Sequence, residues 1–402
     1  MFETGLRRAS SRLSAGARFC SAAPTSHSLF MARKFAGRVR SIVLATLTLG
    51  LIGTGCRHHT LPAGVAQQRV DTLWYATARQ RRNNRLTHKL SDSIEYGWYR
   101  LASRANVDIM RHGIDMRVID SARVSEANFL TAIAAPSKDA NGVVVLSVHG
   151  YATNHSKAIR DAGEAYLRSG TSARWVVFSW PSSGRGMNLM QPGRFFLTSA
   201  YRGDSVAAAQ SRPAFAQLLL KVHAAVGGSR LAVVTHSLGA QLATESMAGD
   251  TLVRSQLLQS PLRAIGLFEP DVPARRFAEY TAQQLQPITR RVALYAASND
   301  GMLRFSSMVN RGGRAGLLGE SSRAIDGVET IDITSGESSE DWFRRRFGTH
   351  HAMKKETGAL RDFFDIVVAG RKPMCRITNG TAELRADKLW RLLPAPIRSS
   401  SC

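Results

Sequence analysis

The nine residues Leu-Ala-Val-Val-Thr-His-Ser-Leu-Gly, at positions 231–239, decide the predicted fold. Positions 231–234 are continuously apolar, as in a strand that is buried on both faces of a parallel sheet. Ser237 follows within three residues, and the sequence Leu-Gly-Ala-Gln-Leu-Ala then begins a helical pattern. A serine on a tight turn between a strand and a helix forms a nucleophile elbow, which projects the hydroxyl above the carboxyl edge of the sheet. Ser237 is therefore the candidate nucleophile.

The neighbours of Ser237 fit this elbow in part. Strand and helix nearly touch at such a turn, so the residues two before and two after the serine must be small. Gly239 meets the requirement, whereas Thr235 stands where the pattern Gly-x-Ser-x-Gly has its first glycine. The alternative is that Ser237 is an ordinary N-cap of a helix that follows a strand.

Strand-like and helix-like segments alternate along much of the chain. Short apolar runs, five of the six nearly continuous and rich in β-branched or aromatic residues, are separated by segments of helical length. This alternation predicts βαβ units and an α/β fold, with a doubly wound, mostly parallel sheet and helices on both faces. The predicted strands are residues 143–148, 175–179, 231–234, 265–268, 292–296 and 328–333, and the predicted helices are residues 156–168, 205–225, 238–247, 274–284 and 355–369.

A second motif follows the first of these strands, where the sequence reads His149-Gly150-Tyr151. In α/β-hydrolases a His-Gly turn after an early strand presents a backbone N–H to the developing oxyanion. The predicted oxyanion donors are the N–H groups of Tyr151 and Leu238. His149 is expected to pack in the turn, because the catalytic base should follow the serine in chain order.

The acid and the base of a triad should follow later strands. Asp300 comes directly after the strand at 292–296, and His350 comes after the last strand and before the closing helix. Imidazole is needed to take the proton of the serine hydroxyl, and the carboxylate fixes the tautomer of the imidazole. The predicted triad is therefore Ser237, Asp300 and His350.

Each partner has an alternative. Asp271 follows the preceding strand and is the rival acid, although it could instead cap a helix before Pro273. His351 is the rival base, next to His350.

From about Phe129 to Val367 the chain resembles a bacterial α/β-hydrolase family of unknown function, of the esterase/lipase superfamily type. The family usually has Ala at the position of Thr235 and carries its late histidine in a Gly-His-Ser-Tyr-like motif, which here reads Thr-His-His-Ala. Spacing to Leu360 and Asp362 favours His350 over His351. The resemblance implies the fold and the reaction class. It rests on the motifs at residues 148–154, 178–184, 201–215, 235–239, 269–272 and 298–300.

The expected activity is hydrolysis of a carboxylic ester through an acyl-enzyme at Ser237, without metal or organic cofactor. The expected partner is a small-molecule ester or lipid substrate. Two alternatives keep the same fold. One is a thioesterase or amidase with the same triad, and the other is a binding or scaffold lipoprotein without catalysis, which Thr235 and the Thr-His-His-Ala stretch would favour.

The N-terminal segment, residues 1–55, is expected to be a signal or targeting segment. A basic stretch from Met31, an apolar run of about a dozen residues and Gly-Thr-Gly-Cys56 follow one another. Small residues before a cysteine resemble a bacterial lipoprotein processing site, although Gly53 stands where Leu is usual. Cys56 is the predicted lipidation site, and the protein is expected in the cell envelope, membrane-anchored or periplasmic. Residues 1–30 are a candidate mis-assigned start.

The remaining boundaries follow from composition. Residues 56–106 are predicted to be a polar tether and extension, 107–370 the hydrolase domain, and 371–402 a loosely packed tail. Cys375 and Cys402 could pair in an oxidising compartment. The formal charge is +24, with the positive residues scattered and no nucleic-acid motif beside them, so no nucleic acid is expected as a partner. No cysteine spacing suggests a metal site.

Overall fold

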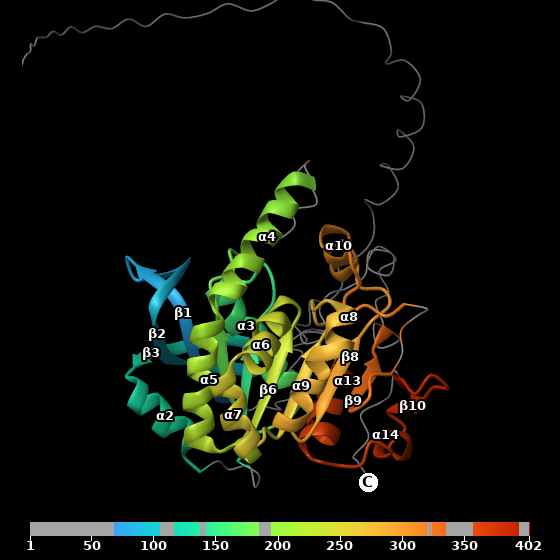
Figure 1. Cartoon of the computed structure of the whole chain (residues 1–402). Coiled ribbons are helices and arrows are strands. Elements are labelled where there is room, and N and C mark those ends of the chain that lie inside the picture. The colour runs from blue at the N-terminus through green and yellow to red at the C-terminus, as the bar shows by residue number, and fades with distance from the viewer. Residues whose placement is uncertain are drawn as a thin grey trace, which may run out of the picture. The chain divides into compact units, whose positions relative to one another are not determined.

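The computed structural model describes residues 68–104, 116–136, 142–184, 194–319, 322, 324–334, 357–393 and 402. Residues 64–402 form one compact unit, which Figure 1 shows with its labelled helices and strands. The expected signal segment and Cys56 lie outside the described residues, as do His350 and His351.

An eleven-stranded sheet, in the order β10-β11-β9-β8-β7-β6-β4-β5-β1-β2-β3, runs through the unit. Its central six strands are parallel, and each corresponds to one of the apolar runs that the sequence predicts as strands. The fold class is therefore confirmed. These strands are β4 (Val144–Val148), β5 (Arg174–Ser179), β6 (Leu231–His236), β7 (Ala264–Phe268), β8 (Val292–Ala296) and β9 (Val328–Asp332).

Helices cover both faces of this sheet, because alternate residues of the strands point to opposite faces. In β4, Val144 and Leu146 belong to one buried apolar cluster, whereas Val145 belongs to a second. The first cluster includes residues of α2 (Glu126–Ala134), α5 (Arg212–Val226), α6 (Leu238–Gly249), α7 (Thr251–Gln259), η2 (Phe277–Thr281) and α9 (Ala282–Leu285). The second includes residues of α3 (His155–Ser169), α13 (Thr357–Asp362) and η5 (Phe363–Val368).

The single helix predicted over residues 205–225 is two helices, α4 (Arg194–Gln210) and α5. They meet at Ser211, and Pro213 lies in the first turn of α5. Proline has no N–H to donate, so it suits the start of a helix rather than its interior. The helix predicted over residues 274–284 begins as α8 (Ala274–Arg276) and continues through η2 and α9. The short elements that the sequence does not predict include η1 (Gly228–Arg230), η3 (Gln286–Ile288) and α10 (Gly301–Val309).

The expected polar tether is wrong for residues 68–104. They form β1 (Gln68–Arg82) and β2 (Arg85–Arg104), which join at an Asn83-Asn84 turn with φ of 47° and 59°. β1 pairs in parallel with β5, and β2 pairs with β3 (Met116–Val124). One reason for the error is that several residues of this three-stranded extension face solvent, so its strands lack a continuous apolar run.

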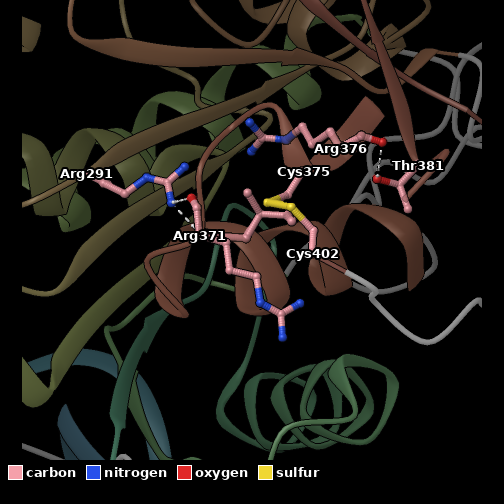
Figure 2. The surroundings of a disulfide bond; sticks show 7 residues. Arg291, Arg371, Cys375, Arg376, Thr381 and Cys402 are labelled. Carbon is pink, nitrogen blue, oxygen red and sulfur yellow. Dashed lines mark hydrogen bonds between the residues drawn. A yellow bond between two sulfur atoms is a disulfide. The ribbon is translucent and has the colours of Figure 1, made fainter. Parts of the chain in front are cut away.

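The expected loose tail is also wrong for residues 371–393. They form α14 (Cys375–Thr378), β10 (Ala382–Leu384) and β11 (Trp390–Leu392), and β11 extends the sheet by pairing in parallel with β9. Cys375 and Cys402 are joined by a disulfide beside this segment, as Figure 2 shows. Its elements have only three or four residues each and depend on tertiary contacts, so the local sequence pattern does not predict them.

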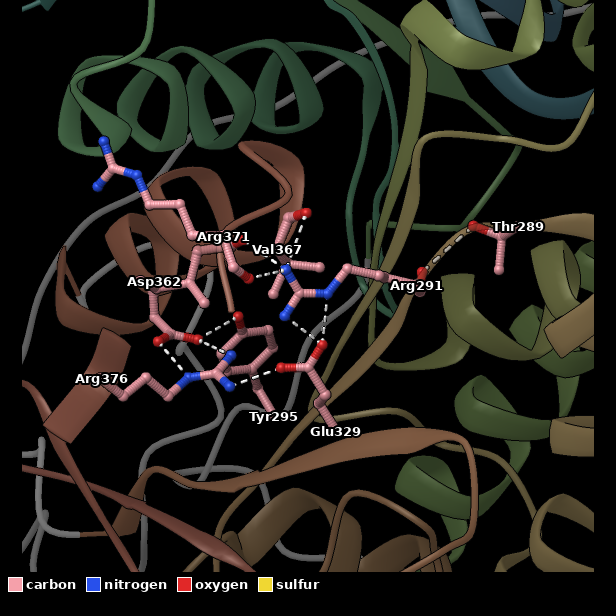
Figure 3. Close-up of polar contacts among 9 residues, drawn as sticks. Thr289, Arg291, Tyr295, Glu329, Asp362, Val367, Arg371 and Arg376 are labelled. Atoms are coloured by element: carbon pink, nitrogen blue, oxygen red, sulfur yellow. Dashed lines mark hydrogen bonds and ion pairs between the residues drawn. The ribbon is translucent and has the colours of Figure 1, made fainter. Parts of the chain in front are cut away.

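Buried ion pairs anchor the C-terminal segment to the sheet (Figure 3). Arg376 forms a bidentate pair with Asp362, with N–O distances of 2.7 and 2.8 Å, and both side chains are fully buried. Arg376 also pairs with Glu329 of β9, and the Tyr295 hydroxyl donates to Asp362.

Among the described residues, no helix is long and apolar enough to cross a membrane.

Candidate functional site

Ser237 lies on the turn between β6 and α6, with φ of 54° and ψ of −125°. Only glycine adopts positive φ without steric cost, so this conformation stores strain, as in a nucleophile elbow. Three backbone hydrogen bonds hold it. The N–H of Ser237 donates to the carbonyl of Phe268 at 3.0 Å, and its carbonyl accepts from Ala240 at 2.9 Å and Asp271 at 3.1 Å. Ser237 occupies the N-cap position of α6, but within the described chain its hydroxyl makes no cap hydrogen bond, and its φ differs from the extended backbone usual for a serine N-cap.

Two glycines permit the close packing around this turn. A Cβ on Gly239 would lie 2.3 Å from the carbonyl oxygen of His149, and a Cβ on Gly150 would lie 2.8 Å from the Cβ of Ser237. Thr235, the larger residue in the motif, is fully buried, and its hydroxyl donates to the carbonyl of Gly266 at 3.4 Å. The site therefore accommodates threonine where the pattern has glycine.

The predicted oxyanion donors lie on either side of Ser237. Leu238 is the first residue of α6, and Tyr151 directly follows Gly150, which packs on Ser237. The Nδ1–H of His149 donates to the Gly150 carbonyl at 3.0 Å, since a carbonyl can only accept. Burial and the positive charge of Arg79 hold the pKa of His149 well below its usual value, so its imidazole is neutral.

The indole of Trp180 packs against the same turn. It stacks on the His149 ring with the centroids 5.0 Å apart, and its Nε1–H donates to the His149 carbonyl at 2.7 Å. His149 therefore packs in the turn, as its place in the chain predicts.

The two candidate acids have different surroundings. Asp271 is buried, and its carboxylate accepts from the hydroxyls of Tyr201 at 2.7 Å and Ser306 at 2.6 Å. Its Oδ1 also lies 3.2 Å from Nε of Arg314. These contacts tie the turn after β7 to α4 and α10. Asp271 caps no helix, because the N-cap of the following helix is Pro273.

Asp300 is fully buried at the carboxyl end of β8 and is the N-cap of α10. Its Oδ1 accepts from the N–H of Leu303 at 2.9 Å. β8 is separated from β6 only by β7, so Asp300 and Ser237 follow nearby strands at one edge of the sheet. The two candidate bases, His350 and His351, lie outside the described residues.

Sequence patterns did not single out several polar residues that surround this site. Arg79 is buried and donates to the carbonyls of Thr153 and Ser182. Asp204 is buried and accepts from Ala152 and Ser182. Asp204 lies within the motif at 201–215, which is one available signal, whereas Arg79 lies in a basic run, which by itself predicts a solvated tether.

A buried acid and histidine also adjoin the nucleophile. Glu269 Oε2 lies 3.2 Å from Nε2 of His236, and Glu269 has a φ of 45°.

A cavity of about 440 Å³ lies beside the segment before Asp300 and is lined by residues that include Ser298, Thr334 and Arg385, but not Ser237. No group of three or more His, Cys, Asp or Glu residues in the described ranges is arranged to hold a metal ion.

Solved structures of similar fold include three esterases or hydrolases, each at low identity. A CIB-like hydrolase of Thermoplasma acidophilum is 13% identical, with a TM-score of 0.31 over 75% of this chain and 98% of that one. A carboxylesterase of Mesorhizobium loti is 16% identical, with a TM-score of 0.27 over 56% and 88%. An esterase of Pyrobaculum calidifontis is 10% identical, with a TM-score of 0.28 over 74% and 86%.

A comparison with curated proteins found no match. The family model described as "Alpha/beta hydrolase of unknown function (DUF900)" matches residues 125–356, which is more than half of the chain. This range holds β4 to β9 and the Ser237 elbow, whereas β1 to β3 precede it. The chain therefore belongs to this α/β-hydrolase family of unknown function.

Proposed function

We propose that the protein is a serine hydrolase that cleaves carboxylic esters through an acyl-enzyme at Ser237. The hydroxyl attacks the substrate carbonyl, and His350 takes the proton and returns it to the leaving alcohol. Asp300 orients the imidazole, and the N–H groups of Tyr151 and Leu238 donate to the oxyanion. A water molecule then attacks the acyl-enzyme, and His350 again acts as the base. The proposal needs no metal or organic cofactor.

The strained turn at Ser237 carries this proposal. A serine with φ of 54° costs on the order of 1–3 kcal/mol, and such strain persists where the surrounding structure holds it for a purpose. Here Gly239 and Gly150 leave room for the turn, and three backbone hydrogen bonds hold it. A turn that only connected a strand to a helix would gain nothing from this conformation.

The partners of Asp271 support Asp300 as the acid. Asp271 already accepts from Tyr201 and Ser306 and is paired with Arg314. A carboxylate held by these three groups is poorly placed to orient an imidazole as well. The chain order Ser237, Asp300, His350 is also the order that α/β-hydrolases use.

Hydrolysis of p-nitrophenyl esters of increasing acyl length tests this assignment. Ser237→Ala and His350→Gln should each lower kcat by a factor of about 10³ or more, whereas His351→Gln should stay within about tenfold. A stronger loss in His351→Gln than in His350→Gln would assign the base to His351. Full activity in Ser237→Ala would refute the serine mechanism.

We also propose that the protein is exported and attached to a membrane through a lipidated Cys56. The pairing of Cys375 with Cys402 supports export, because disulfides persist in oxidising compartments and are rare in the cytosol. Radiolabelled palmitate should appear on the unchanged protein and be absent from Cys56→Ala. Label that remained on Cys56→Ala would refute attachment at this residue.

A further inference from the structure

We propose that Arg79, from the N-terminal extension, is a positioning residue that holds the oxyanion loop, residues 149–154, in its working geometry. The inference rests on the proposed function, because it concerns the loop that presents the Tyr151 N–H. It assigns a role in the reaction to β1, a strand that lies outside the range that the family model matches.

The guanidinium of Arg79 joins three segments of the chain. Its Nη2 donates to the carbonyl of Thr153 in the oxyanion loop at 2.7 Å, and its Nη1 donates to the carbonyl of Ser182 at 3.0 Å. Its Nε donates to the hydroxyl of Ser179, at the end of β5, at 3.0 Å. Nη1 also donates to the carbonyl of Thr87 in β2 at 3.2 Å. The planar fork of arginine can meet such a set of acceptors, whereas lysine cannot.

The oxyanion loop depends on this network for its shape. Ala152 has a φ of 54°, which is costly for alanine, and its N–H donates to Asp204 at 3.0 Å. The N–H of Thr153 donates to the hydroxyl of Ser182 at 2.9 Å, and that hydroxyl donates to Asp204. Arg79 donates to the carbonyls of the same two residues, Thr153 and Ser182. Tyr151 is therefore followed directly in the chain by Ala152 and Thr153, a strained segment that these hydrogen bonds hold in place.

The local path of β1 aims Arg79 at this loop. The pairing between β1 and β2 has register shifts on both sides of Arg79, between Thr77 and Arg79 and between Arg79 and Arg81. Bulges of this kind occur next to active sites, where they redirect a side chain. Thr77 fixes the neighbouring position, because its hydroxyl donates to the carbonyl of Ser179 and accepts from the N–H of Arg79.

Charge explains why a buried cation is tolerated here. Arg79 is only 2% exposed, and burial lowers its pKa to about 10, although the nearby carboxylate of Asp204 opposes this shift. The side chain therefore stays protonated at neutral pH.

A displacement of about 1 Å in a group that stabilises the transition state can cost on the order of 100-fold in rate, so a loosened loop should lower kcat.

The test compares Arg79→Ala and Arg79→Lys with Arg81→Ala in the full chain. Arg81 is a matched control, because it lies two residues further along β1 and pairs with Glu95 rather than with the loop. Arg79→Ala should lower kcat for an ester about 10- to 100-fold with KM changed less than about threefold. Arg79→Lys should give an intermediate loss, and added guanidinium should restore part of kcat in Arg79→Ala. Arg81→Ala should retain the kcat of the unchanged protein.

Hydrogen exchange of the peptide that covers residues 149–154 supplies a readout that needs no activity. Its amides should exchange faster in Arg79→Ala than in Arg81→Ala, while the peptides of β6 and β7 stay protected. Unchanged exchange with unchanged kcat in Arg79→Ala would overturn the inference. So would an equal loss of protection throughout the protein without rescue by guanidinium, which would mean a general structural role. If the unchanged protein hydrolyses no ester, the proposed function fails, and exchange alone decides whether Arg79 holds the loop.

Discussion

The main-chain N–H of Asp271 donates to the carbonyl oxygen of Ser237 at 3.1 Å, so the turn after β7 is tied directly to the nucleophile elbow. The carboxylate of the same residue points to other partners, the hydroxyls of Tyr201 and Ser306, and is paired with Arg314. Asp271 therefore contacts the nucleophile through its backbone and helps to hold the elbow. Asp271 differs in this from Asp300, whose carboxylate caps α10.

The two acids should respond differently to the same substitution. Asp300→Asn should lower kcat by a factor of about 10³–10⁴, because an amide cannot stabilise the imidazolium, and the amide oxygen can still cap α10. Asp271→Asn should keep kcat within about tenfold but lower the free energy of unfolding by about 3 kcal/mol, because Arg314 loses its buried counterion. Ester kinetics and urea unfolding measure both effects. A larger loss of kcat in Asp271→Asn would make Asp271 the acid of the triad.

The central sheet could be predicted from the sequence because its parallel strands are buried on both faces. Residues 143–148 and 292–296 are almost entirely apolar for this reason, and each range forms a strand. The outer strands could not be predicted in the same way. β2 contains many polar residues, and β10 and β11 have three residues each, so their structure depends on contacts with the rest of the sheet.

Gly239 should not tolerate a side chain. In Gly239→Ala the new Cβ would lie 2.3 Å from the carbonyl oxygen of His149, so the turn after β4 or the start of α6 must shift. We expect a loss of about 1–3 kcal/mol in the free energy of unfolding and a fall in kcat. Gly249→Ala, at the end of the same helix, meets no atom within 4 Å and is the control. Equal stability and kcat in the two variants would contradict the close packing of the elbow.

The buried pair between Arg376 and Asp362 should be costly to break. Both side chains are fully buried, and Arg376 is also held by Glu329 and stacks on Trp390 at 5.1 Å. Asp362→Asn should lower the free energy of unfolding by about 3–5 kcal/mol, since it leaves a poorly compensated buried cation. Denaturant unfolding measures the loss.

An exposed pair provides the control for this prediction. Glu279 pairs with Arg275 one helical turn away, and their side chains are 62% and 87% exposed. Glu279→Gln should change the free energy of unfolding by less than about 0.5 kcal/mol. If Asp362→Asn were as mild as Glu279→Gln, the C-terminal segment would not depend on the buried pair.

His155 should make the protein less stable in acid. Burial, with help from the charge of Arg79, lowers the pKa of His155 to about 3, and its Nε2 lies 3.1 Å from the hydroxyl of Tyr99. The unfolded chain takes up a proton here below about pH 6.5, whereas the folded protein does so only near pH 3. The free energy of unfolding should therefore fall by about 1.4 kcal/mol per pH unit from this residue as the pH decreases between these values.

His155→Gln removes this titration. The slope of unfolding free energy against pH should become shallower by about 1.4 kcal/mol per unit between about pH 5.5 and pH 4, and the two slopes should coincide above about pH 7.5. Urea unfolding at a series of pH values measures it. Identical slopes in the acid range would mean that His155 is already protonated in the folded protein.

The strained turn at Ser237 could be predicted from the sequence because a strand, a serine and a glycine at fixed spacing leave few local structures open. The same is true of the turn at His149 and Gly150. Arg79 could not be predicted, because its partners in the loops are about 70 to 100 residues away in the chain and its basic neighbours suggest a solvated run. Chain position alone favours Asp300 over Asp271 as the acid, whereas the partners that occupy the Asp271 carboxylate, such as Tyr201 and Arg314, are brought to it only by the fold.

The site of modification by a fluorophosphonate probe tests the central claim most directly. The unchanged protein and Ser237→Ala would be treated with the probe, and the adduct would be located by peptide mass spectrometry. The account predicts one adduct, on Ser237 in the segment between β6 and α6, that ester substrate suppresses and that Ser237→Ala lacks. An adduct on another residue, or undiminished labelling of Ser237→Ala, would contradict it.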